Sequence, residues 1–290
     1  MTNWIYAALA TALGVVVGGA VTDTLPRWQS WGEWRAPQLE GAQPGGFNEN
    51  KAAVQPAYGE GQVPKLEILH SDNNYLIVNK PYDVRMDGDH DVTVLSLIHK
   101  HFGSDPLPPI HFAHRLDYAT SGVLCCALNK KAIRTACGLF ERREVRKQYL
   151  AVCFGHIEQD FCEIEVPIAD FVPAAEADRR VPTGGQNSGK DFRMTVGVEG
   201  VIGRHAHTNV TVLERGLYDG KPASKVLLSP LTGRRHQLRV HLLHIGHPIV
   251  GDYTYAKDET SPRMMLHAWR LSLPLPPALG GHLDIETPDP

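Results

Sequence analysis

A carboxylate lies beside an arginine in the segment His114–Gly122, directly before an apolar run. That run, Val123–Leu128, is short and rich in strand-forming residues, which predicts a buried strand. Asp117 therefore lies on a loop that leads into a core element, where reactive groups are often held, and its carboxylate could act as a nucleophile. The same pattern is also typical of an Asx or ST turn, in which the carboxylate would only bind backbone amides.

Further segments with distinctive residue types follow along the chain. Lys147–Gly155 alternates polar and apolar residues and ends at a glycine, which predicts a strand. Leu231–His241 predicts a turn that leads into an amphipathic helix, with its basic side chains away from the apolar face. Three shorter blocks complete the series: Tyr75–Pro81, Gly246–Asp252 and Arg263–Ala268.

In this order, the segments resemble the motifs of the RluA-type pseudouridine synthases. The resemblance extends over residues 65–275 and is most specific in His114–Gly122 and Leu231–His241. It implies that Asp117 is the catalytic aspartate and that Tyr149 packs on the target uracil. Thr120 and Leu266 are expected to line the pocket.

One stretch departs from the bacterial members of that family. Tyr82–Asp87 replaces their usual Gly- and His-containing sequence and, together with Arg263–Ala268, looks closer to the animal members. In relatives this loop borders the cleft, so the departure concerns the nucleotides that flank the target.

The reaction implied by the resemblance needs only a carboxylate and a closed pocket. Converting uridine to pseudouridine breaks the N-glycosidic bond, rotates the uracil and joins C5 to C1′, without redox change or transfer of an external group. Asp117 could attack C1′ or C6, or assist departure of the base through a glycal, and these routes stay open. A nearby guanidinium is needed to keep the carboxylate charged, and Arg239 is the candidate. We expect neither a metal ion nor an organic cofactor.

RNA binding is assigned to basic residues near these positions. By resemblance, Arg115 fills the space that the flipped uridine leaves; otherwise it would pair with Asp117 or with a surface glutamate. Tyr149 would stack on the flipped base, unless it is an ordinary half-buried strand aromatic. Two basic runs suggest a phosphate-guiding groove, although such runs are usually solvated faces. The expected RNA-binding residues are His114, Arg115, Arg142, Arg143, Arg146, Lys147, Arg234, Arg235 and His236.

Composition sets broader limits. The chain has 290 residues, of which 42% are hydrophobic, and can bury a substantial core. Its formal charge of −3 argues against indiscriminate nucleic-acid binding. The five cysteines form no CxxC pair, which indicates core residues of an intracellular protein in a reducing compartment. His241, His244 and His247 recur at helical spacing, but Gly246 and Pro248 would break the helix, which disfavours a metal site.

The N-terminal region differs from the rest of the chain. Residues 4–21 form an uncharged apolar run about long enough to cross a bilayer. We predict a hydrophobic segment at 1–25, either a membrane anchor or a signal sequence, and a Gly-, Pro- and Gln-rich linker at 26–63. Arg27 and Arg35 follow the run, so an anchored form would place the catalytic part on the cytoplasmic side.

A catalytic domain is expected at 64–290, as a monomer. Helix patterns occur at 93–101, 130–142 and 236–245. Strand patterns occur at 66–70, 75–79, 123–128, 147–154, 162–168, 208–214, 224–229 and 264–273. Because strict βαβ alternation is lacking, we predict the α+β class, with a mixed, largely antiparallel central sheet flanked by helices and loops. Residues 170–206 are expected to form a mobile loop that crosses the RNA face.

The leading hypothesis is an RNA pseudouridine synthase, an isomerase that acts on uridine in a tRNA-like or rRNA-like stem-loop. A second hypothesis is an RNA-binding or chaperone protein that keeps the groove but has lost turnover. A third is a membrane-tethered interaction module. The presence of Asp117, Tyr149 and Arg239 together favours the enzyme.

Overall fold

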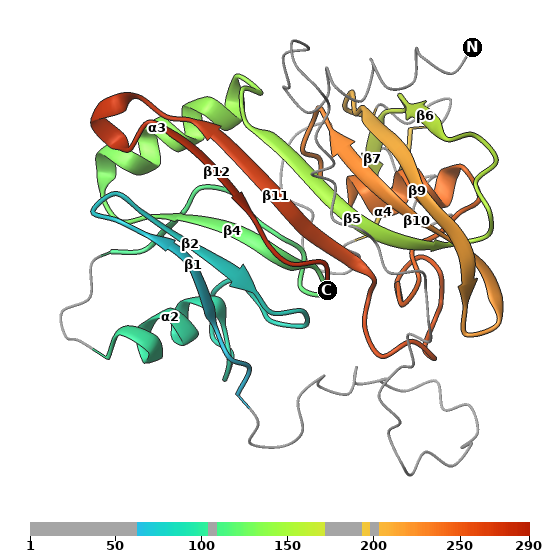
Figure 1. Ribbon diagram of the computed structural model, residues 1–290, viewed down its shortest axis with the longest axis horizontal. Coiled ribbons are helices and arrows are strands. Elements are labelled where there is room, and N and C mark those ends of the chain that lie inside the picture. Colours follow the sequence, from blue (N-terminus) through green and yellow to red (C-terminus); the bar gives the residue numbers. More distant parts are fainter. Residues whose placement is uncertain (1–62, 104–108, 172–192, 198–202) are drawn as a thin grey trace, which may run out of the picture. The chain divides into compact units, whose positions relative to one another are not determined.

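The computed structural model describes residues 63–103, 109–171, 193–197 and 203–290 (Figure 1). All of them belong to one unit, Leu39–Pro290. The predicted hydrophobic segment 1–25, including the run at 4–21, lies outside the described residues, as does the predicted linker 26–63 except for Val63. Among the residues that are described, no helix is long and apolar enough to cross a membrane.

The described ranges contain more strands than helices. The helices are α2 (Val94–Phe102), α3 (Lys130–Glu141), α4 (Gln237–His244) and the short 3-10 helix η1 (Pro277–Leu279). The strands are β1 (Glu67–Ser71), β2 (Tyr75–Lys80), β3 (His111–Phe112), β4 (Ser121–Ala127), β5 (Arg146–Phe154), β6 (Phe161–Ile164), β7 (Ile168–Asp170), β8 (Met194–Val196), β9 (Thr208–Tyr218), β10 (Lys221–Pro230), β11 (Leu266–Pro274) and β12 (His282–Glu286).

Most of these strands form one sheet, in the order β1-β2-β4-β11-β5-β10-β9-β6, with β12 beside β11 and β3 beside β4 (Figure 1). The β4–β11 pair is parallel, and the other strand pairs in the described residues are antiparallel. The predicted α+β class with a mixed, largely antiparallel sheet is therefore confirmed.

The centre of the sheet depends on one glycine. Gly122, at the start of β4, has a φ of +113° and pairs with Ala268 of β11. A Cβ atom at this position would lie 2.2 Å from the Ala268 carbonyl oxygen, so a larger residue cannot occupy it without displacing β11. Because Gly122 follows the loop that carries Asp117, the same residue places that loop beside β11.

Alternating strand residues bury two faces of the sheet. Ile77 and Val123 pack in one core cluster with Ala136 of α3, whereas Val78 and Leu124 pack in another with Ile98 of α2. Since successive strand residues point to opposite faces, α2 and α3 cover opposite faces of this part of the sheet. A third cluster joins β5 and β10 to Leu238 and Leu242 of α4.

Two of the three helices predicted from sequence begin after a residue whose side chain caps the helix. The Thr93 side chain accepts the Ser96 N–H, and the Ser96 side chain in turn accepts the Thr93 N–H, which forms a capping box at α2. Asn129 caps α3 by accepting the Ala132 N–H. The residue before α4, His236, is different, because its side chain makes no capping hydrogen bond.

The predicted elements differ from the structure in three places. The expected strand at 162–168 is divided into β6 and β7, because Ile168 turns away to pack with Met194 and Val240 in a small separate cluster. Strands β3 and β12 were not predicted. Most of the expected mobile loop at 170–206 lies outside the described residues, at 172–192 and 198–202. In its described part, Met194–Val196 forms strand β8, which pairs with β7, so the prediction of a loop is wrong at these residues.

Candidate active site

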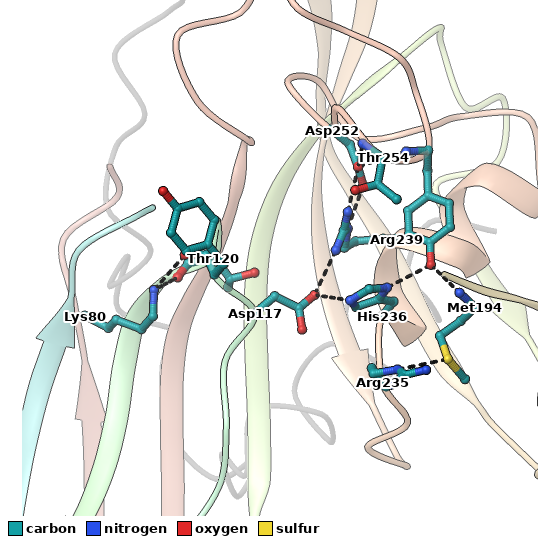
Figure 2. Close-up of polar contacts among 11 residues, drawn as sticks. Lys80, Asp117, Thr120, Met194, Arg235, His236, Arg239, Asp252 and Thr254 are labelled. Atoms are coloured by element: carbon teal, nitrogen blue, oxygen red, sulfur yellow. Dashed lines mark hydrogen bonds and ion pairs between the residues drawn. The ribbon is translucent and has the colours of Figure 1, made fainter. Parts of the chain in front are cut away.

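Asp117 lies in a turn that its backbone closes without the help of its side chain. The Asp117 carbonyl accepts the Thr120 N–H at 3.1 Å. Within the described residues, the carboxylate contacts only Arg239 and His236, both through Oδ2, and no donor contacts Oδ1. Its side chain is 28% exposed. The Asx-turn interpretation therefore does not hold, because the carboxylate points across to α4 (Figure 2).

The side chain of Lys80 bonds to the backbone of this turn. It is fully buried at the end of β2, and its Nζ donates to the carbonyls of Pro81, Tyr118 and Thr120 at 2.8–2.9 Å. Burial lowers the pKa of Lys80 to about 7, and the nearby Asp83 and Asp117 oppose that shift. Two of the three bonded carbonyls, those of Tyr118 and Thr120, lie in the same turn as Asp117, so the Lys80 side chain orders the backbone that carries the carboxylate.

Arg239, the third residue of α4, is fixed by a carboxylate other than Asp117. Its Nε and Nη2 donate to the two oxygens of Asp252 at 2.7 and 2.8 Å, a bidentate pair whose side chains are 8% and 1% exposed. Its Nη1 lies 3.3 Å from Asp117 Oδ2, as the sequence predicted. Burial lowers the pKa of Arg239, but Asp252 and Asp117 raise it more, so the guanidinium stays charged.

Asp252 is itself oriented by the backbone that follows it. Its Oδ1 accepts the N–H groups of Thr254 and Tyr255 at 3.0 and 3.1 Å. The preceding Gly251 has a φ of +74°, and a Cβ atom there would lie 1.9 Å from the Arg263 carbonyl oxygen. Glycine at 251 thus lets the chain pass close to the Arg263 backbone, and the buried Asp252 carboxylate that follows pairs with Arg239.

His236 lies on the other side of the Asp117 carboxylate. Its Nε2 is 4.0 Å from Asp117 Oδ2, and its Nδ1 is 2.8 Å from the hydroxyl of Tyr255 (Figure 2). The Tyr255 hydroxyl accepts the Met194 N–H at 2.7 Å, and the Arg239 guanidinium lies 4.8 Å from the centroid of the Tyr255 ring. These contacts place His236 in the candidate active site, and its predicted RNA binding stays a prediction.

The turn before α4 is closed by a glutamine. Oε1 of Gln237 accepts from the Thr232 hydroxyl and from the Arg234 N–H, at 2.7 and 3.0 Å. Its Nε2 donates to the His207 carbonyl and to the Thr208 hydroxyl. All the polar atoms of this buried side chain are therefore used to hold the turn, which leaves the neighbouring His236 and Arg239 free to face Asp117.

Tyr149 and the two expected pocket residues lie on the central strands. Tyr149 is half-buried on β5, opposite Ala268, and packs against two of the core clusters. Burial and the charge of Asp117 raise its pKa, so its phenol stays protonated. Thr120 and Leu266 are buried, the first with its carbonyl bonded to Lys80 and the second within the core around β5.

Two neighbouring residues of the Asp117 loop have opposite surroundings. Arg115 is 72% exposed, and its Nη2 lies 3.7 Å from Asp87 Oδ1, so the expected alternative pairing with Asp117 or a glutamate is not what the structure shows. His114 instead accepts the Cys125 N–H at 3.0 Å and stacks on Phe140. Burial lowers the pKa of His114 to about 3. The contacts of His114 hold β4 in place, and its expected role in RNA binding stays a prediction.

Lys147, in the first basic run, bonds to the backbone just before the second basic run. Its Nζ donates to the Thr232 carbonyl at 3.2 Å, and burial lowers its pKa to about 8. Arg142, Arg143 and Arg146 are exposed, although Arg142 pairs with Glu144. In the other run, Arg234 donates to the His205 carbonyl and Arg235 pairs with Asp170. Whether these residues bind phosphates stays a prediction.

The histidines at helical spacing have other partners. His241 contacts the Thr208 hydroxyl and the Val166 carbonyl, and His247 contacts the Phe154 carbonyl. In the described ranges, no group of three or more His, Cys, Asp or Glu side chains is arranged to hold a metal ion.

Three residues of this site were not among the predicted ones: Lys80, Asp252 and Tyr255. A lysine at the end of an apolar strand, followed by proline, was a signal for the first. Asp252 closed a segment that the sequence singled out without assigning it a role. No sequence pattern pointed to Tyr255, because its contacts with Met194 and His236 are set by the tertiary fold.

The fold and this arrangement together define the class of protein. A family model described as RNA pseudouridylate synthase matches residues 74–244, a span that includes Asp117, Tyr149 and Arg239. The chain belongs to this family and is an RNA pseudouridine synthase, an isomerase, as its resemblance to the RluA-type enzymes predicted.

Individual relatives cover most of the chain. It is 39% identical over 245 residues to human RNA pseudouridylate synthase domain-containing protein 1, across 79% of this chain and 72% of that protein. It is 34% identical over 239 residues to the dual-specificity RNA pseudouridine synthase RluA of Escherichia coli strain K12, across 80% of this chain and 96% of that enzyme.

Solved structures show the same fold. The structure of human RNA Pseudouridylate Synthase Domain Containing 1 aligns with a TM-score of 0.63 at 39% identity, covering 79% of this chain and 86% of that one. Human RNA Pseudouridylate Synthase Domain Containing 4 aligns with a TM-score of 0.58 at 26% identity, covering 77% and 88%.

Proposed function

We propose that this enzyme isomerises uridine in a structured RNA, a tRNA or an rRNA, with Asp117 as the reacting carboxylate. One observation carries the proposal. Asp117 is partly exposed, a buried guanidinium contacts its Oδ2, and Oδ1 has no donor among the described residues. The guanidinium pairs with one oxygen of the carboxylate, and the other oxygen is available to the substrate.

The reaction needs no group that the chain lacks. The N1–C1′ bond breaks, the C5–C1′ bond forms, C5 loses its proton, and N1 gains one, so atoms and electrons balance within the nucleotide. Asp117 can serve attack at C1′, attack at C6 or the glycal route. Arg239 does not move in any of these routes, because Asp252 holds it by two hydrogen bonds.

The substrate uridine must leave its stack to reach Asp117. Unstacking costs a few kcal/mol and costs least in loops and single strands. Arg115 is exposed on the same loop as Asp117 and can occupy the vacated space, while Tyr149 stacks on the flipped uracil. The relative RluA is named a dual-specificity RNA pseudouridine synthase, which supports testing more than one class of RNA as substrate.

The non-catalytic alternative is not favoured. A protein that only binds or remodels RNA does not require a buried Asp252 to fix Arg239 against Asp117. Intact Asp117, Tyr149 and Arg239, together with membership of the family, support turnover.

The assay for this function compares two matched substitutions. Purified protein is incubated with pools of tRNA and rRNA, and pseudouridine is mapped by its chemical adduct. We expect product from the parent and from Asp219→Asn, which changes an exposed turn residue between β9 and β10. Asp117→Asn should give none. Absence of product from the parent on both pools, or equal product from Asp117→Asn, would contradict the proposal.

A second assay tests the shape of the RNA. One uridine is placed in a hairpin loop and then in a perfect duplex of the same length. We expect a faster reaction in the loop, and an affinity that falls steeply with salt because phosphate contacts release counterions. Equal rates, or an affinity insensitive to salt, would rule out this picture of recognition.

We further propose that the protein works as a monomer in a reducing intracellular compartment, held at a membrane by residues 4–21 with the catalytic part in the cytoplasm. The buried free thiols of Cys125, Cys126 and Cys153 support the reducing compartment. Fractionation of the tagged full-length chain against a chain starting at Lys65 tests the membrane, and light scattering tests the monomer. Equal solubility of the two chains would contradict the anchor.

A further inference from the structure

We propose that His236 is a positioning residue for Asp117: Tyr255 fixes its neutral tautomer so that Nε2–H faces Asp117 Oδ2 and leaves Oδ1 for the substrate. This inference rests on the proposed role of Asp117 and deepens it.

The Tyr255 hydroxyl accepts one hydrogen bond and can donate one. A backbone N–H can only donate, so the Tyr255 oxygen accepts from Met194 at 2.7 Å. In the described part of the chain, the acceptor within reach of the hydroxyl proton is Nδ1 of His236, at 2.8 Å. Burial raises the pKa of Tyr255, so the proton is retained. Nδ1 therefore accepts, and the ring proton of the neutral imidazole lies on Nε2.

The opposite edge of the ring faces the Asp117 carboxylate. Nε2 lies 4.0 Å from the same Asp117 oxygen that Nη1 of Arg239 contacts at 3.3 Å. The other tautomer would face this carboxylate with a lone pair, which is repulsive. Both edges of the ring thus favour the same tautomer. Hydrogen bonds in unliganded active sites are often long and tighten with substrate, and a small movement of the Asp117 loop would close this one.

The charge of the imidazole agrees with this geometry. Burial lowers the pKa of His236; Arg239 and Arg235 lower it further, while Asp117 and Asp252 oppose the shift. The net lowering keeps the ring neutral at pH 7, so His236 contributes a hydrogen-bond donor and Arg239 contributes the positive charge.

The side chain of His236 does not cap α4, although the residue directly precedes this helix. It precedes α4 with φ 55° and ψ 17°, a left-handed conformation that is uncommon for residues other than glycine. Its side chain makes no capping bond, and Gln237 closes the turn instead. This conformation directs the ring toward Tyr255 and Asp117, and strained residues of this kind cluster at functional sites.

The two oxygens of Asp117 have unequal surroundings: Oδ2 accepts from Nη1 of Arg239 and faces Nε2 of His236 at 4.0 Å, whereas Oδ1 is left for the reacting nucleotide. Loss of His236 leaves Arg239 as the one group of the described residues that orients the carboxylate. We expect this to reduce the rate of the chemical step more than RNA affinity, because most of that affinity comes from phosphate contacts.

The tautomer is measured first, on the RNA-free protein labelled with 15N-histidine. Long-range 1H–15N spectra distinguish protonated from unprotonated ring nitrogens, and the His236 signals are assigned by their loss in His236→Gln. We expect an Nε2–H tautomer in the parent. Tyr255→Phe keeps the ring beside Arg239 but removes the hydroxyl, and we expect it to increase the population of the other tautomer. An Nδ1–H tautomer in the parent would overturn the inference.

Turnover is then measured on an RNA that the parent modifies. His236→Ala is expected to lower kcat by about 10²-fold with little change in RNA affinity. His236→Gln, whose amide can still donate, should recover part of that loss, and His244→Ala, an exposed histidine on the same helix, should behave as the parent. An active parent with an unaffected His236→Ala variant would contradict only this inference, whereas an inactive parent would contradict the proposed function.

Discussion

Two arginines of the active-site region carry the same charge in opposite settings. Arg239, from the region of α4 and the turn after it, is 8% exposed and is held by Asp252 at 2.7 and 2.8 Å. Arg115, from the Asp117 loop, is 72% exposed and lies 3.7 Å from Asp87. A buried bidentate pair fixes a charge before RNA arrives, whereas an exposed pair is worth 1 kcal/mol or less and leaves the side chain free to reorient. In the proposed mechanism, the arginine that pairs with the reacting carboxylate is thus separate from the arginine that would contact the RNA.

The largest effect is expected where the two regions meet. Asp117→Asn should reduce pseudouridine formation by about 10³-fold or more, because the amide keeps the shape of the side chain but is not a nucleophile. Thermal stability and RNA affinity should stay close to those of the parent. Single-turnover assays and a binding titration on one RNA measure both quantities, and turnover within about tenfold of the parent would exclude Asp117 as the reacting group.

Arg239→Met should affect both stability and turnover. Removing the guanidinium leaves Asp252 buried without its partner, and loss of one member of a buried pair typically costs about 3–5 kcal/mol. The free energy of unfolding, from denaturant titration, should fall by this order, and turnover should fall because Asp117 loses its neighbouring charge. If this variant unfolds and turns over like the parent, the interpretation of the buried pair is wrong.

A double variant separates these two losses. Arg239→Met combined with Asp252→Asn removes the stranded charge but keeps an oxygen for the N–H groups of Thr254 and Tyr255. We expect it to regain part of the stability and none of the turnover. Recovery of both would mean that Arg239 acts only through folding.

Arg115→Ala should change neither stability nor initial RNA capture to a comparable degree. We expect a slower single-turnover rate, by about 10- to 100-fold, because unstacking the uridine costs a few kcal/mol and the vacated space would stay empty. Asp87→Asn is the matched control, since it releases Arg115 without removing it. Base flipping can be followed with a fluorescent base beside the target uridine. An equal loss in capture and in flipping would show that Arg115 acts only as a phosphate contact.

The smallest effect on RNA modification is expected at His114, beside Arg115. Its pKa is about 3 in the folded protein against the ordinary 6.5, so the unfolded chain binds a proton first as the pH falls. His114 therefore supports stability above pH 6.5 and loses that contribution progressively toward pH 3, by up to about 1.4 kcal/mol per pH unit. His114→Gln, whose amide oxygen can accept the Cys125 N–H, should show a shallower loss of unfolding free energy between pH 6.5 and 4 and unchanged RNA affinity. A weakened RNA affinity of this variant would instead support the predicted role of His114 in RNA binding.

These contrasts show which parts of the molecule could be predicted from sequence. Strands such as β2 and β4 were apparent because each buries a continuous apolar run, and the pairing of Asp117 with Arg239 followed from the need to charge a carboxylate. His114 and its neighbour Arg115 were both predicted to bind RNA, but of the two only Arg115 is exposed, because sequence adjacency does not tell which way a loop side chain turns. Lys80, Asp252 and Tyr255 were missed because their contacts depend on how the loops pack.

The parallel pairing of β4 with β11 at Gly122 has a consequence for how the enzyme becomes active. Asp117 and Arg239 are 122 positions apart in the chain, and the loop that carries Asp117 is positioned only when β11 has docked beside β4. Contacts between such distant segments form late, because a large loop must be closed first. Local hairpins such as β9–β10 can form without this step. During refolding, the circular dichroism of the strands should therefore return before pseudouridine formation does, and a partly folded chain would have much of its sheet but no active site.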